Sequence, residues 1–167
     1  MSAYTSHAGP PELPELEYQL LRALCAAAGP RSIEELADTI GRAPGGIRAT
    51  VHRLTGDGYA QEHSAWILSR TGRAALTDRA VRRPLTEPQQ AVLRALDATD
   101  GARTAEELAS MLSHVSDVSE TIRSLSTAIY VRPVPAFAPT GRAHRALSGL
   151  VTMRLLEHKK NGNCLPG

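Results

Sequence analysis

Residues 32–60 read SIEELADTIGRAPGGIRATVHRLTGDGYA, and residues 66–76 read WILSRTGRAAL. Ser32 followed by Glu35 is a capping box, in which each side chain satisfies an unpaired amide at the start of a helix. Gly41 predicts the end of that short helix, because glycine readily adopts the left-handed conformation found there. The first stretch therefore begins with a helix of about two turns and a tight turn.

A second helical pattern follows the turn. Pro44 is tolerated in a first helical turn, and Ile47, Val51 and Leu54 have the spacing of one buried face. Residues 59–68 then read as two short strands around a polar turn at 62–64. We expect Thr71 to cap a further helix after this hairpin.

Several motifs of the first half recur in the second half at a nearly constant displacement. LRAL begins at 21 and 93 and EELA at 34 and 106, so both are displaced by 72 residues, whereas TGRA begins at 71 and 140 and is displaced by 69. Chance identities would scatter over unrelated displacements. We infer two copies of one unit, each large enough for a small domain that packs on the other.

This element order resembles the winged-helix-turn-helix superfamily, and the apolar strand ending in Leu-Ser-x-x-Gly is similar to the end of the wing in MarR- and PadR-type regulators. The resemblance covers residues 16–76 and, more loosely, 88–147. It implies a mainly α fold with small β-hairpin wings (α+β), duplicated in tandem. We expect a flexible tail over 1–15, winged-helix domains over 16–83 and 84–147, the end of a C-terminal helix over 148–160, and a tail over 161–167.

In winged-helix proteins that bind DNA, the outward residues of the third helix enter the major groove. Arg48 could bind guanine through two hydrogen bonds, and the paired glycines would let the backbone approach a phosphate. The alternative is an ordinary solvated helix surface. The expected DNA contacts are Arg42, Gly45, Gly46, Arg48, Ala49, His52 and Arg53, with His63 and Ser64 at the wing tip and Arg70 and Arg73 at its base.

The second copy has a less favourable surface for DNA. Its third helix, within 116–126, presents carboxylates outward, and three prolines at 133, 135 and 139 predict a short, degenerate wing. We expect this surface to be weakened or used for packing; the alternative is a pseudo-dimer that reads two half-sites. Its candidate contacts are Ser116, Ser119, Glu120 and Arg123.

The remaining composition argues against other chemistry. Cys25 lies on an apolar helix face, and no residues have the spacing of a catalytic site, a metal site or a phosphate-binding loop, so we expect no enzyme, metal or cofactor. No apolar run approaches the roughly 18 residues of a membrane span, and two cysteines suit a reducing compartment, so we expect a cytoplasmic protein. The linker contains no cluster of charged or aromatic residues, so the sequence does not predict an effector pocket there.

The function expected from the resemblance is a bacterial transcriptional regulator that binds double-stranded DNA and occludes or recruits RNA polymerase. The preference for arginine over lysine is typical of GC-rich genomes. The net charge of +2 and the acidic second copy favour an alternative, a protein-interaction adaptor of a chromosome complex. A DNA-binding protein of replication or partition is a further alternative. The apolar stripe of the helix over 142–158 would pack on the first domain or pair two chains in a homodimer.

Overall fold

The computed structural model describes residues 13–77 and 83–161, which contain eight helices and a four-stranded antiparallel sheet. The second half repeats the order of elements of the first half. The elements are α1 (Glu15–Ala26), β1 (Arg31–Ser32), α2 (Ile33–Ile40), α3 (Pro44–Gly56), β2 (Ala60–Leu68), α4 (Arg70–Thr77), α5 (Glu87–Thr99), β3 (Arg103–Thr104), α6 (Ala105–Met111), α7 (Val118–Thr127), β4 (Val131–Pro139) and α8 (Gly141–Asn161). The expected tails fall almost entirely outside the described residues.

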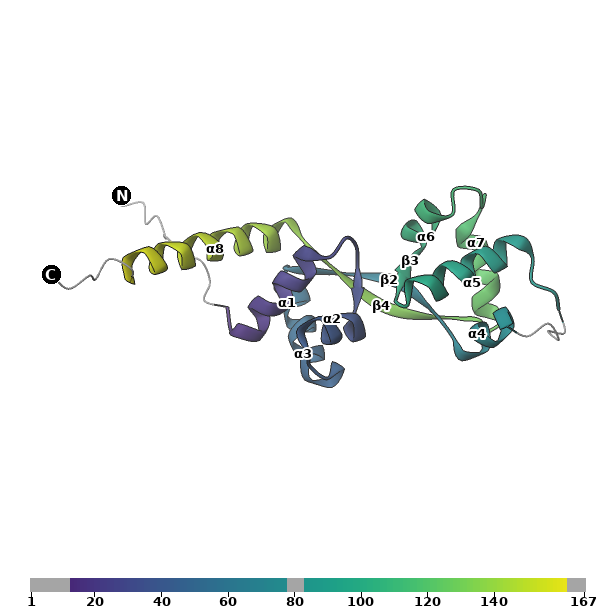
Figure 1. Cartoon of the computed structure of the whole chain (residues 1–167), viewed down its shortest axis with the longest axis horizontal. Helices are drawn as coiled ribbons and strands as arrows, with labels where there is room; N and C mark the ends of the chain where they lie inside the picture. Colours follow the sequence, from purple (N-terminus) through teal and green to yellow (C-terminus); the bar gives the residue numbers. More distant parts are fainter. Residues whose placement is uncertain (1–12, 78–82, 162–167) are drawn as a thin grey trace, which may run out of the picture.

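A long two-stranded ribbon joins two helical lobes (Figure 1). Strands β2 and β4 pair antiparallel from Ala60 opposite Pro139 to Leu68 opposite Val131. The short strands β1 and β3 flank them, which makes the sheet order β1-β4-β2-β3. Lobe one contains α1, α2, α3 and the start of α8, and lobe two contains α4, α5, α6 and α7.

Each lobe has a core that the other half of the chain completes. The core of lobe one consists mainly of leucine and isoleucine from α1, α2 and α3, but it also contains Phe137 and Ala143 from the second half. The core of lobe two is built on α5, α6 and α7, and Trp66, Leu68 and Leu76 of the first half pack against it. The two halves therefore exchange their long strands and the helices that follow them.

The expected hairpin within residues 59–68 is wrong. Residues 60–68 form one continuous strand, and His63 and Ser64 lie in its middle, opposite Ala136 and Pro135. A two-residue hairpin turn needs residues that accept a positive φ, usually Gly or Asn, and 62–64 contain neither. The strand instead continues and pairs with a partner of equal length.

The expected degenerate wing in the second half is also wrong, because β4 is a full nine-residue strand. Proline is tolerated in a strand where its nitrogen faces away from the neighbouring strand. On its other side β4 meets β1 only at Ala136 and Phe137, so the edge beside Pro133 and Pro135 has no strand that needs a donor.

The capping box predicted at Ser32 and Glu35 is confirmed, and the same motif begins two further helices. The capping boxes that begin α2, α5 and α6 are all present. The expected cap at Thr71 is wrong, because Ser69 Oγ accepts the hydrogen bond from the Gly72 amide at 2.9 Å. Thr140 accepts from the Ala143 amide at 3.4 Å in the same way. Ser69 and Thr140 thus correspond, and the two TGRA motifs do not occupy equivalent positions.

Helix α8 is much longer than its counterpart α4. Its first turns pack on lobe one through Ala143 and Ala146, whereas Leu155 and Leu156 farther along are exposed. Within the described residues, no helix combines the length and apolar character that crossing a bilayer requires. Pairing of two chains through α8 stays a prediction.

Ile129, in the turn after α7, has an unfavourable backbone conformation for a residue with a side chain. Gly58 follows α3 with a φ of 77°, and the corresponding Ile129 follows α7 with a φ of 65° and 70% exposure. A left-handed conformation costs a residue with a Cβ atom about 1–2 kcal/mol, which exceeds the extra backbone entropy that glycine loses on folding. We expect Ile129→Gly to raise the free energy of unfolding by about 1 kcal/mol in urea titrations. A loss of stability would mean instead that the isoleucine side chain makes packing contacts that outweigh its strain.

Candidate nucleic-acid interface

Helices α2 and α3 form a compact pair in lobe one with a clear inner and outer face. Gly41 ends α2 with a φ of 70°, and the chain turns directly into α3. Ile47, Val51 and Leu54 are completely buried, as the sequence pattern predicts. The other face of α3, with Arg48, is exposed to solvent.

The N-terminus of α3 is open and free of negative charge. Ala43 offers no side-chain cap, and no acidic residue lies in the first turn. A Cβ atom added at Gly45 or Gly46 would meet nothing within 4 Å, so another molecule can approach the backbone there. The helix dipole and the exposed Arg42 and Arg48 all favour a negative group at this end.

Arg53 has a structural partner. Its guanidinium lies 2.7 Å from the carboxylate of Glu17, a buried residue of α1. A buried carboxylate needs a partner, because an unpaired charge in the interior is strongly destabilising. Glu17 was missed in the sequence, although it lies three and four residues before Leu20 and Leu21, and a carboxylate within an apolar stripe indicates a buried ion pair.

His52 and Ala49 are exposed on α3. The His52 ring packs edge-to-face against Phe137 of β4, with the ring centroids 5.8 Å apart. Part of the His52 ring is therefore engaged with the end of the exchanged strand.

The exchange of strands separates the residues expected at the wing from α3. Arg70 and Arg73 lie on α4 in lobe two, where Arg73 pairs with Asp97 at 3.4 Å. The second half instead brings Arg142 to lobe one, where its guanidinium lies 4.8 Å from the centre of the Tyr59 ring. Arg142 was missed because residues 59–68 were interpreted as a local hairpin.

The corresponding helix of lobe two, α7, has a closed N-terminus. Asp117 caps it by accepting a hydrogen bond from the Glu120 amide at 2.9 Å. Glu120 in turn pairs with Arg123, and Gln89 donates to Ser124 at 3.1 Å. Ser116 and Ser119 are exposed.

Other reactive groups are scarce in the described residues. Cys25 packs against the core of lobe one, and this burial raises the pKa of its thiol, which keeps it protonated near neutral pH. Within the described ranges no group of three His, Cys, Asp or Glu side chains is placed to hold a metal ion.

No known protein family, curated protein or solved structure matches this chain.

Proposed function

We propose that this chain is a sequence-specific DNA-binding protein, a transcriptional regulator built from two tandem winged-helix units that exchange their wings. The observation that supports this most is the first turn of α3, which is uncapped, free of acidic residues and flanked by exposed Arg42 and Arg48. A duplex phosphate would meet the helix N-terminus, and Arg48 would reach a base edge in the major groove.

In this proposal lobe one contacts the duplex and lobe two does not. Its helix α7 has a carboxylate cap, and its arginine is already paired with Glu120. Phosphates would be repelled by these carboxylates.

The test is the affinity for duplex DNA as a function of salt concentration. Each lost phosphate contact lowers the slope of log affinity against log salt by about 0.9. We expect Arg42→Ala to lower the slope by about one contact and Arg48→Ala to weaken a preferred sequence by about 1–3 kcal/mol. Arg53 is unsuitable for this test, because its removal would leave Glu17 buried without its ion-pair partner.

Two further variants separate DNA contact from folding. Arg123→Ala is the matched control on α7 and should leave the salt slope unchanged. Gly46→Ala adds a Cβ atom in open space, so it should preserve or raise stability through helix propensity while it weakens DNA binding. Equal losses for Arg48→Ala and Arg123→Ala would contradict the assignment of binding to lobe one.

A second candidate function is a protein-interaction adaptor. The net charge of only +2 and the exposed Ile129 on lobe two favour it. If the parent protein binds no duplex even at low salt, the DNA proposal fails and the adaptor becomes the better explanation.

A further inference from the structure

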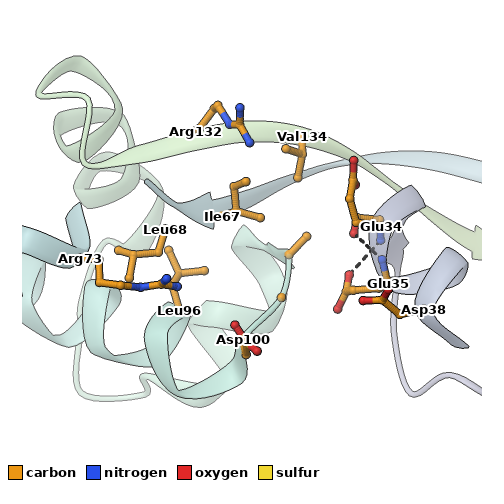
Figure 2. Close-up of a pocket in the computed structure, with 13 residues that line it drawn as sticks. Glu34, Glu35, Asp38, Ile67, Leu68, Arg73, Leu96, Asp100, Arg132 and Val134 are labelled. Carbon is orange, nitrogen blue, oxygen red and sulfur yellow. Dashed lines mark hydrogen bonds between the residues drawn. The ribbon is translucent and has the colours of Figure 1, made fainter. Parts of the chain in front are cut away.

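A cavity of about 290 Å³ lies between the two lobes, beside the β2–β4 ribbon (Figure 2). Its wall from lobe one is α2, which contributes Glu34 and Asp38, and its wall from lobe two includes Asp100 at the end of α5. The ribbon contributes Arg132 and the apolar Val134. The cavity is near the small end of the range found for ligand pockets.

The carboxylates of this cavity fall into two groups. Glu35 is committed to the fold, because it completes the capping box of α2 and pairs with Arg31 at 3.4 Å and with Arg103 of the other lobe at 3.3 Å. Glu34, Asp38 and Asp100, by contrast, form no ion pair with any described residue. Their charges are available to a bound molecule.

Two of these free carboxylates, Asp38 and Asp100, occupy locally unfavourable positions. Asp38 lies in the last turn of α2, where the helix dipole disfavours a negative charge. It also follows Glu34 by four residues, and like charges at this spacing repel. Asp100 has a φ of 44°, in the left-handed region that residues with a Cβ atom rarely adopt. Departures from local preference of this kind are expected at functional sites.

The internal repeat shows which of these residues the shared scaffold needs. Glu35 and Gly101, which touch each other across the lobes, recur as Glu107 and Gly29, which also touch. Three charged residues of the cavity do not recur. Asp38 corresponds to Ser110, Asp100 to Ala28 and Arg132 to Gln61. These three charges occur at only one of the two sets of equivalent positions, so the repeated scaffold does not account for them.

We propose that this cavity binds a small organic cation that also carries a carboxylate. The cationic group, an ammonium or guanidinium, lies against Asp38 and Asp100, and the carboxylate lies against Arg132. Val134 and neighbouring apolar side chains contact the aliphatic part between the two charged groups. The inference is independent of DNA binding, since the cavity uses neither the exposed face of α3 nor its N-terminus.

Isothermal titration calorimetry on the full chain tests the proposal with L-arginine as the probe. We expect L-arginine to bind and to raise the melting temperature, and L-glutamate to do neither. The double variant Asp38→Asn/Asp100→Asn should bind L-arginine at least about tenfold more weakly. The loss of one charge-assisted hydrogen bond usually lowers affinity by more than about tenfold. Agmatine, which lacks the carboxylate, should also bind more weakly, and Arg132→Gln should remove the difference between the two probes.

The thermal stability of the free variants distinguishes a binding role from a structural one. The double variant should melt at a higher temperature than the parent, because it relieves the repulsion from Glu34 and from the helix dipole. Glu106→Gln, at the position that corresponds to Glu34 in the other lobe, is the control and should leave L-arginine binding unchanged. The proposal is overturned if L-arginine produces no heat and no thermal shift at millimolar concentration, or if the double variant binds it as tightly as the parent.

Discussion

Replacing Phe137 with alanine is expected to lower the free energy of unfolding by about 3–5 kcal/mol, the usual cost of removing a buried aromatic ring. Phe137 is completely buried among residues of α1, α2 and α3, although it belongs to the second half of the chain. The backbone of Phe137 is paired with Arg31 on one side and Glu62 on the other, which limits how far β4 can move to fill the space. The melting temperature should fall by roughly 6–20 °C.

Hydrogen exchange shows which lobe responds to the Phe137 substitution. Amides of α1, α2 and α3 should lose protection first, because the cavity opens in lobe one. Trp66→Ala is the matched variant, since Trp66 occupies the corresponding strand position and packs against the core of lobe two. It should mainly affect α5, α6 and α7. If the two variants affected the opposite lobes, each half would form its own wing and the exchange would be refuted.

The second large effect is expected at Gly72. A Cβ atom at this position would overlap the backbone carbonyl oxygen of Tyr130 and lie 2.9 Å from a methyl group of Leu68. That carbonyl accepts a hydrogen bond from the Ser69 amide at 3.0 Å, so it cannot move away without loss. We expect Gly72→Ala to destabilise the protein by about 3 kcal/mol, at the upper end of the cost of overpacking.

Gly149→Ala is the control for this substitution. Gly149 also lies within a helix, but a Cβ atom there meets nothing within 4 Å, so alanine should stabilise the protein by up to about 1 kcal/mol through helix propensity. Urea unfolding followed by circular dichroism measures both variants. Equal effects of the two substitutions would show that Tyr130 does not approach α4 as closely as the structure indicates.

The candidate site was predictable only in part. The buried face of α3 follows from the spacing of Ile47, Val51 and Leu54, and the exposure of Arg48 follows from the same spacing. The ion pair of Arg53 with Glu17 joins two helices that are remote in sequence, so no local pattern contains it. Arg70 and Arg73 were grouped with α3 because they are near it in sequence, yet the continuing strand carries them to the other lobe.

The sequence by itself determined the helices, the capping boxes and the repeated order of elements, because helices and their caps depend on contacts between residues three or four positions apart. It could not determine which partner residues 60–68 choose. A strand in a local hairpin and a strand paired with 131–139 have the same apolar pattern, and the absence of Gly and Asn from 62–64 is a local signal against the hairpin that does not identify the other partner. The choice depends on pairing and burial over about 70 residues, where Phe137 and Trp66 each complete the core of the opposite lobe. Only the tertiary structure shows that these long-range contacts replace the two expected hairpins.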